Sequence, residues 1–95
     1  MFLHVTEAKY LHDYLVEVTF NNGRRGYADL SEALHGPVFE PLKDVALFSR
    51  LRVDKDLQTI TWENGVDLAP EYIYFQAFKS DAELAFQFRE WGYLQ

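Results

Sequence analysis

A pair of carboxylates beside a turn is the first candidate for chemistry in this sequence. Glu63 and Asp67 flank Asn64-Gly65, a dipeptide that favours hairpin turns, so antiparallel pairing could bring the two side chains together. Two neighbouring carboxylates can share a proton and act as acid and base. Trp62 could line the same cleft. These three residues form a candidate ligand or catalytic site, although a turn rim is wet and Asp67 can instead cap a helix near Pro70.

The histidines give little support for a metal site. His4, His12 and His35 form no H-x-x-x-H or H-E-x-x-H pair, which would place two ligands on one helical face. Asp29 and Glu32 precede His35 at spacings of three, but a short capped helix explains them as well. The chain also has no Gly-rich phosphate loop and no nucleophile elbow. We therefore expect no metal and no cofactor, and favour a non-enzymatic protein.

The charge balance bears on nucleic acid. The chain has 9 Lys and Arg against 15 Asp and Glu, a net charge of −6. Phosphate backbones are bound by clustered basic side chains, and the only adjacent pair is Arg24-Arg25. We expect no nucleic-acid partner, and binding through Arg24 and Arg25 stays as an alternative.

The C-terminal quarter carries a surplus of aromatic side chains. Eight of the sixteen aromatic residues lie in residues 72–95. Two short helices can bury only some of them against their own core, and aromatic residues are enriched at interfaces. The candidate interface residues are Tyr74, Phe78, Phe86, Phe88, Trp91 and Tyr93.

These candidates need elements to position them, and the first half of the chain has the pattern of strands. Residues 14–20 alternate so that their apolar side chains share one face. Residues 21–23 read Asn-Asn-Gly, which predicts a tight reversal. Residues 24–29 should return as the partner strand, and a strand over residues 2–8 is expected to pair with this hairpin.

The second half alternates between helical and extended patterns. A short helical turn is expected to end at Gly36-Pro37, and Pro41 suits the first position of the next helix. The later expected elements are strands over residues 51–54, 58–62 and 66–68 and a helix over residues 71–78.

The last helix has clear sequence boundaries. Ser80 and Glu83 match a capping box at its start, and Gly92 suits the left-handed geometry at its end. The apolar side chains that share one helical face are Leu84, Phe88 and Trp91.

Together these elements predict an α+β protein. The order β-β-β-α-β-β-β is mixed rather than alternating, which indicates small antiparallel or mixed β-sheets with the C-terminal helices packed on them. The length of 95 residues suits a single domain over residues 1–95. Within it, we expect an α+β core over residues 1–78 and a capping or interface helix over residues 79–95.

The chain has no cysteine, no visible signal peptide and no apolar run as long as a membrane span. We therefore expect a cytoplasmic protein without membrane contact.

Residues 59–74 resemble the signature of a bacterial family catalogued as domain of unknown function 2442. The segment reads T-I-T-W-E-N-G-V-D-L-A-P-E-Y-I-Y, and the family pattern runs approximately I-x-W-x-N-G-x-D-L-x-P. Glu63 stands where the pattern favours proline. The resemblance implies a compact α+β fold and a prokaryotic source, and supplies no catalytic residues. It also implies that such proteins are often encoded beside another small protein.

Taken together, these features favour a regulatory or accessory protein-interaction domain. Its partner would be another small protein, as for an antitoxin, or a second copy in a homo-oligomer, most simply a dimer. The alternatives are a ligand-binding or enzymatic cleft at Trp62, Glu63 and Asp67, and nucleic-acid binding through Arg24 and Arg25.

Overall fold

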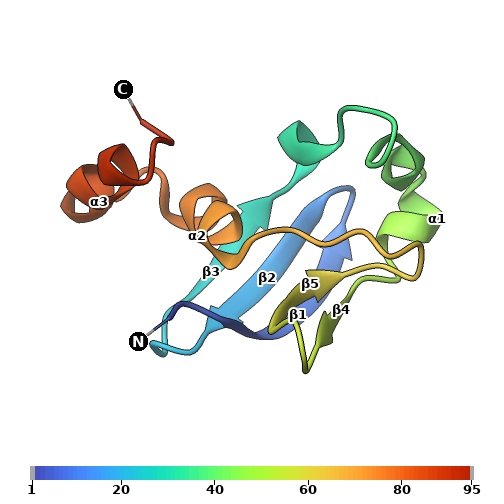
Figure 1. Ribbon diagram of the computed structural model, residues 1–95, viewed down its shortest axis with the longest axis horizontal. Helices are drawn as coiled ribbons and strands as arrows, with labels where there is room; N and C mark the ends of the chain where they lie inside the picture. The colour runs from blue at the N-terminus through green and yellow to red at the C-terminus, as the bar shows by residue number, and fades with distance from the viewer. Residues whose placement is uncertain (1, 95) are drawn as a thin grey trace.

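Two antiparallel sheets form the scaffold of the computed structural model, which describes residues 2–94 (Figure 1). The larger sheet has the order β1-β2-β3, and the smaller sheet pairs β4 with β5. The strands are β1 (Val5–His12), β2 (Leu15–Phe20), β3 (Arg25–Asp29), β4 (Arg52–Asp54) and β5 (Thr59–Thr61).

Short helices connect and cover these sheets. Figure 1 shows α2 lying over the strand β3, with α3 beyond it at the C-terminal end of the chain. The 3₁₀-helices are η1 (Ser31–Ala33), η2 (Glu40–Lys43) and η3 (Ala82–Leu84), and the α-helices are α1 (Val45–Phe48), α2 (Pro70–Phe78) and α3 (Ala85–Glu90). The predicted α+β class, with small sheets and C-terminal helices, is confirmed.

The predicted hairpin of β2 and β3 is also confirmed. Val16, Val18 and Phe20 alternate along β2 and are all buried, as one face of a half-buried strand requires. The N–H of Phe20 donates to the carbonyl of Arg24 at 2.9 Å, which closes the turn. Gly23 has a φ of 86°, a value that glycine adopts without steric cost.

The first strand lies further along the chain than the sequence predicted. β1 covers Val5–His12 rather than residues 2–8, and it pairs with β2 from Val5↔Phe20 to His12↔Leu15. At the start of β1, the side-chain oxygen of Asn21 accepts from the N–H of His4 at 2.9 Å, and the backbone N–H of Asn21 donates to the carbonyl of His4 at 2.9 Å. A side-chain bond therefore stands where one backbone bond of a longer strand would lie.

The strand predicted over residues 66–68 is wrong beyond a single bridge, which pairs Thr61 with Asp67. Threonine hydroxyls add to the few backbone hydrogen bonds of this segment. Thr59 donates its hydroxyl to the carbonyl of Leu68 at 2.6 Å, and Thr61 donates to the carbonyl of Val66 at 2.9 Å. The backbone N–H of Trp62 also donates to the carbonyl of Val66 at 3.0 Å, so hydroxyl and backbone hydrogen bonds together hold residues 66–68 beside β5.

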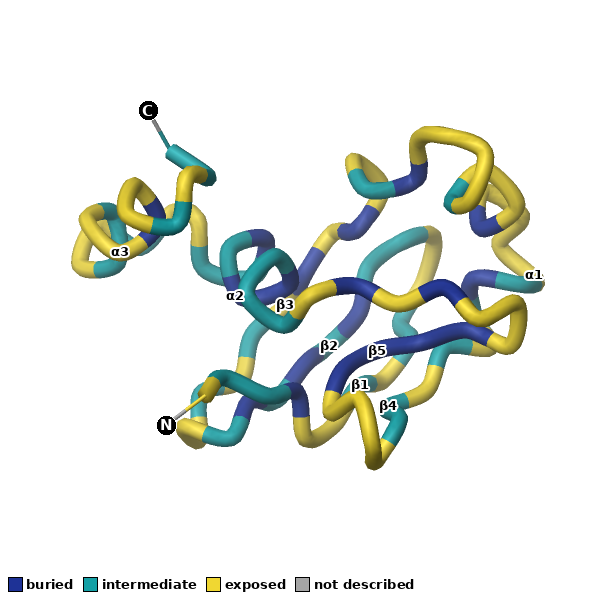
Figure 2. The backbone as a smooth tube through the Cα atoms, viewed as in Figure 1, coloured by how far each residue is buried: buried dark blue, intermediate teal, exposed yellow. Residues whose placement is uncertain are grey.

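The core lies under the inward face of the larger sheet, where Figure 2 shows β2 and β5 as largely buried segments. Helix α2 approaches β3 closely at Gly26. A Cβ atom at this position would lie 2.8 Å from Cε1 of Phe78, which is closer than van der Waals contact allows. Gly26 therefore leaves room for the ring of Phe78, and a side chain at this position would require that ring to shift.

The start of the last helical segment differs from the predicted capping box. Asp81, and not Ser80, is the cap, since its Oδ1 accepts from the N–H of Glu83 at 3.0 Å. The end is as predicted. Gly92 has a φ of 86°, and the N–H of Tyr93 donates to the carbonyl of Phe88 at 2.9 Å.

Candidate interaction site

The three residues of the turn-rim hypothesis do not meet around a cleft. Trp62 is buried, and its indole N–H donates to the carbonyl of Phe48 at 2.9 Å, so the ring belongs to the core. Glu63 is exposed and pairs with Arg50 at 2.9 Å. Asp67 is exposed on the other side of the turn. None of the three lines either of the two cavities described below.

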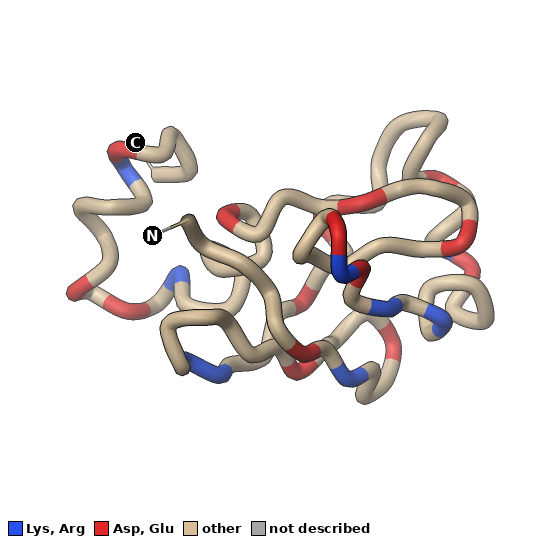
Figure 3. Tube along the Cα trace, turned by 60° about the horizontal axis from the view of Figure 1, so that its bottom comes forward, with Lys and Arg blue, Asp and Glu red and all other residues tan. Residues whose placement is uncertain are grey.

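The two arginines of the β2–β3 hairpin have separate contacts. Arg24 pairs with Asp81 at 2.9 Å, and its guanidinium lies 4.5 Å from the ring centroid of Phe78. Arg25 donates from Nε to the hydroxyl of Thr19 at 3.1 Å. Arg24 precedes β3 and Arg25 is its first residue, and the two side chains are bound to different partners. Figure 3 shows the other Lys and Arg residues dispersed along the chain among acidic ones.

The contact between Arg24 and Asp81 ties the hairpin to the segment that follows α2. The hydrogen bond from the guanidinium, and then that from the N–H of Glu83, lowers the pKa of Asp81 below its usual value. The same ion pair raises the pKa of Arg24. From the sequence, Arg24 had only a candidate role in nucleic-acid binding, whereas in the structure it pairs with Asp81 and contacts the C-terminal segment.

Most of the C-terminal aromatic side chains contact one another. The ring of Phe88 is fully buried, with its centroid 5.1 Å from that of Phe75 and 6.1 Å from that of Tyr74. Tyr93 stacks on Phe75 with centroids 5.1 Å apart. The helices α2 and α3 therefore bury much of their aromatic surface within one chain.

The remaining candidate interface residues differ in exposure. Phe78 packs edge-on against Tyr74, with centroids 4.8 Å apart, and Trp91 is half-buried. Phe86 keeps 70% of its surface exposed. Among the described residues, Phe86 is the most exposed of the six candidates, while Tyr74 and Phe88 are covered.

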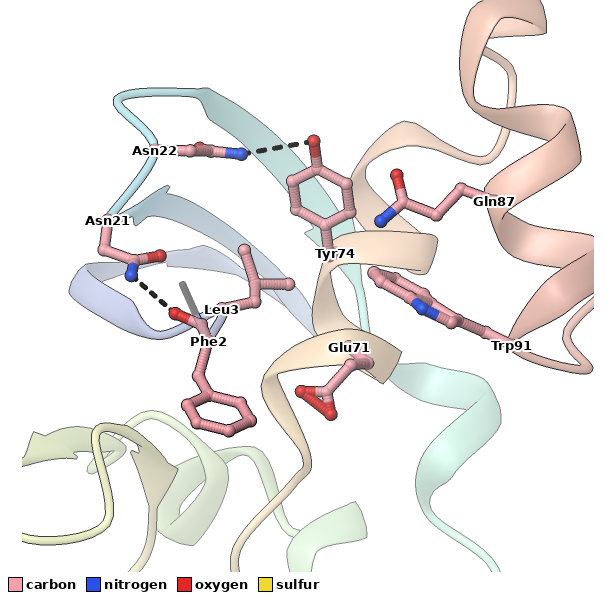
Figure 4. Close-up of a pocket in the computed structure, with 8 residues that line it drawn as sticks. All are labelled: Phe2, Leu3, Asn21, Asn22, Glu71, Tyr74, Gln87 and Trp91. Atoms are coloured by element: carbon pink, nitrogen blue, oxygen red, sulfur yellow. Dashed lines mark hydrogen bonds between the residues drawn. The ribbon is translucent and has the colours of Figure 1, made fainter.

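A cavity opens where four segments meet: the N-terminal segment, the β2–β3 turn, α2 and α3 (Figure 4). Its volume is about 360 Å³. Its lining residues are Phe2, Leu3, Asn21, Asn22, Glu71, Tyr74, Gln87 and Trp91. We call this the α2–α3 pocket. Tyr74 and Trp91 provide aromatic walls, and their ring centroids are 6.1 Å apart.

The polar groups of the α2–α3 pocket are mostly amides. The Nδ2 of Asn22 donates to the hydroxyl of Tyr74 at 3.4 Å, and the Nδ2 of Asn21 donates to the carbonyl of Phe2 at 2.7 Å. Glu71 is the one charged residue of the lining, and Figure 4 shows its carboxylate on the side of the pocket where Phe2 lies. Such a combination of aromatic walls and few polar groups is typical of binding sites.

A second cavity of about 330 Å³ lies between the two sheets, lined partly by His4, Asp54, Lys55 and Gln58. Asp54 is engaged in its turn, because backbone N–H groups of Leu57 and Asp56 bind its carboxylate and lower its pKa. Within residues 2–94, His, Asp and Glu nowhere gather in threes that could hold a metal ion. No helix in this described part of the chain is long and apolar enough to cross a membrane.

Sequence reasoning identified Tyr74 and Trp91 but not the other members of the α2–α3 pocket. Asn21 and Asn22 were assigned only to a turn, and Glu71 and Gln87 only to helices. The one local signal is the i, i+4 spacing of Gln87 and Trp91, which places both on one face of a helix. The remaining lining residues come from segments far apart in the sequence.

The fold defines this chain as a small α+β protein in which C-terminal helices pack on an antiparallel sheet. The sequence profile of the family described as "Protein of unknown function (DUF2442)" matches residues 5–79. The chain belongs to this family, as the resemblance indicated. The match ends at the close of α2, so Gln87 and Trp91 lie outside it.

One solved structure of similar fold is a protein from Nitrosomonas europaea ATCC 19718, described as a "putative DNA binding protein". The TM-score is 0.74 at 18% sequence identity, and the likeness covers all of this chain. The chain spans 64% of the length of that protein. Comparison with curated proteins finds no match.

Proposed function

We propose that this protein is a non-enzymatic, cytoplasmic interaction domain that binds another protein. The observation that supports this proposal is the α2–α3 pocket, which combines aromatic walls, amide groups and one carboxylate at an open surface. The partner would be another small protein, as for an antitoxin, or a second copy of this chain.

Two exposed aromatic side chains strengthen the proposal. Phe2 borders the pocket and has 85% of its surface exposed, and Phe86 precedes Gln87 on α3 and is 70% exposed. Large apolar side chains next to a half-buried Trp are typical of interface centres, where aromatic residues are enriched. The pocket would hold a side chain of the partner, and these two rings would add apolar contact area around it.

The pocket also lacks the features of an active site. Its lining contains one carboxylate and no histidine, lysine, serine or threonine, so no acid–base pair or activated nucleophile faces the cavity. Binding is therefore the function that this geometry supports best.

Affinity capture from cells of the native host tests the proposal. The wild-type chain, a Trp91→Ala variant and a Gln87→Ala variant would each be used as bait, with proteins identified by mass spectrometry. We expect one small protein to be retained by the wild type and reduced at least tenfold by both substitutions. Gln87 is exposed, so its substitution leaves the core intact.

Leu57 offers a matched control, because it is apolar and 53% exposed but lies in the β4–β5 turn. A Leu57→Ala variant should retain the same partner as the wild type. Retention by all four baits, or by none, would remove the α2–α3 pocket as the site of binding.

Nucleic-acid binding is the second candidate, and the description of the Nitrosomonas europaea protein favours it. The net charge of −6 and the separate contacts of Arg24 and Arg25 weigh against it. A mobility-shift series with duplex and single-stranded DNA at rising salt would test it. Binding that weakens with salt and is lost in an Arg24→Ala/Arg25→Ala variant would replace the first proposal.

A further inference from the structure

We infer that the α2–α3 pocket takes the side chain of an arginine from the partner protein. This inference rests on the proposed function and names the chemistry of recognition. It follows from three properties of the lining: its charge, the planarity of its groups and its size.

The charge of the lining favours a cation. Glu71 is its one charged residue, and no ion pair of the described residues includes this carboxylate. Glu71 is the second residue of α2, so the helix backbone fixes its position at the pocket. Arg24, the nearest guanidinium to Tyr74, is already paired with Asp81. A second positive group from outside would therefore meet an unpaired carboxylate.

The rings and amides of the lining are planar, which favours guanidinium over ammonium. Trp91 presents a half-buried indole ring, and a guanidinium ion stacks on such a face while its edge donates hydrogen bonds. The amide oxygen of Gln87 and, on the Phe2 side of the pocket, the carboxylate of Glu71 can accept such hydrogen bonds. Five N–H donors arranged in a plane match this set better than the three donors of a lysine.

The size of the pocket suits one side chain. Its volume of about 360 Å³ lies at the lower end of the roughly 300–1,000 Å³ of small-molecule sites. A dinucleotide or a folded cofactor needs more room, whereas an arginine with its neighbouring backbone does not. Phe2 would then contact the arginine or its backbone at the edge of the pocket, and Phe86 would contact the partner outside it.

A flat ring with hydrogen-bonding edges, such as a nucleobase, is the main competitor, because bases also stack on Trp and pair with amides. The negative charge of Glu71 favours an arginine side chain over a nucleotide in this pocket. It would repel the phosphate that accompanies a nucleotide, and it attracts a guanidinium. Arginine is therefore the proposed occupant, and binding of a nucleotide is one outcome of the test.

The test titrates the full chain with the pentapeptide Gly-Gly-Arg-Gly-Gly, capped at both ends, at low salt. The readouts are the NMR signals of the Trp91 indole N–H and the Gln87 side-chain amide. A peptide with citrulline in place of arginine is the matched probe, since it keeps the shape and loses the charge. We expect the arginine peptide to shift both signals, and the citrulline peptide to bind at least tenfold more weakly.

The variant Glu71→Gln should weaken binding of the arginine peptide at least tenfold. Glu90→Gln is the control, because Glu90 is exposed on α3 and lines neither described cavity, and it should change the affinity less than twofold. Equal binding of the two peptides, no shift at millimolar peptide, or an unchanged affinity in Glu71→Gln would overturn the inference. Adenosine monophosphate shifting the same signals in place of the peptide would do so as well.

Partner capture separates this inference from the proposed function. If the Glu71→Gln bait keeps a partner that the Trp91→Ala bait loses, the pocket binds a protein but not through arginine. If no captured protein depends on Trp91, the proposed function fails, while the peptide titration still reports on the pocket directly.

Discussion

Truncation of Phe88 to alanine measures how firmly α3 belongs to the folded core. The ring of Phe88 is fully buried, with the rings of Phe75, Trp91 and Tyr74 around it at centroid distances of 5.1, 5.8 and 6.1 Å. Removing a buried phenylalanine ring costs about 3–5 kcal/mol, from lost transfer energy and from the cavity left behind. A chain of 95 residues has a free energy of unfolding of about 5–14 kcal/mol, so the loss is a large share.

Urea unfolding followed by circular dichroism and by tryptophan fluorescence is the suitable assay. With a slope of about 1–3 kcal/mol per molar urea, the expected loss moves the midpoint by at least ~1 M. Trp62 lies in the core under the sheets and Trp91 lies at the end of α3, so the two report on different regions. Single Trp→Phe backgrounds should give coincident transitions if α3 unfolds together with the sheets.

Phe86 provides the matched control on the same helix. Its ring is 70% exposed, so Phe86→Ala should change the free energy of unfolding by less than about 0.5 kcal/mol. Equal effects of Phe88→Ala and Phe86→Ala on the free energy of unfolding would show that the burial of Phe88 does not stabilise the fold. A Trp91 signal that changes well before the Trp62 signal would show that α3 detaches independently of the sheets.

Three further predictions follow from individual contacts. Gly26→Ala should lower the free energy of unfolding by about 1–3 kcal/mol, because the new methyl group meets the ring of Phe78. Urea unfolding should show that a Phe78→Leu substitution in the same chain recovers part of this loss. Asp81→Asn should destabilise at pH 7, and in urea titrations the difference from wild type should shrink as the pH falls from about 4 through the lowered pKa of Asp81 in the folded state. The sign follows because the pKa of Asp81 is lowered in the folded state, so its contribution is present above the unfolded value of about 3.9 and lost as pH falls through the folded value. If a second copy is the partner, light scattering at tens of micromolar should give twice the monomer mass. The variant Phe86→Ala should then be a monomer. A monomeric wild type would exclude self-association at that concentration.

Local sequence patterns determined the elements whose signals are short-range. The alternation of Val16, Val18 and Phe20 required a half-buried strand, and Gly23 marked the turn that follows it. Gly92 likewise marked the end of α3. In each case the physical cause acts within a few residues, so the sequence alone carries it.

Choices between competing local groups could not be made from the sequence. Ser80 and Asp81 are both good caps, and the ion pair between Asp81 and Arg24 favours Asp81. The strand expected over residues 66–68 had an adequate pattern, but the structure keeps a single bridge of it, and the hydroxyls of Thr59 and Thr61 also bind its carbonyls. Both outcomes depend on partners brought close by the rest of the fold.

For the candidate site, too, the sequence indicated some features and the tertiary structure decided the others. The sequence by itself determined that aromatic residues crowd the C-terminal quarter, and that Gln87 and Trp91 share a helical face. Only the tertiary structure decided which rings the chain buries, and that Glu71 and the β2–β3 turn complete a pocket with Trp91. Helical spacing fixes the direction of a side chain relative to its own helix. What that side chain meets depends on how α3 packs on α2, which is decided by the sum of contacts such as that of Phe88 with Phe75.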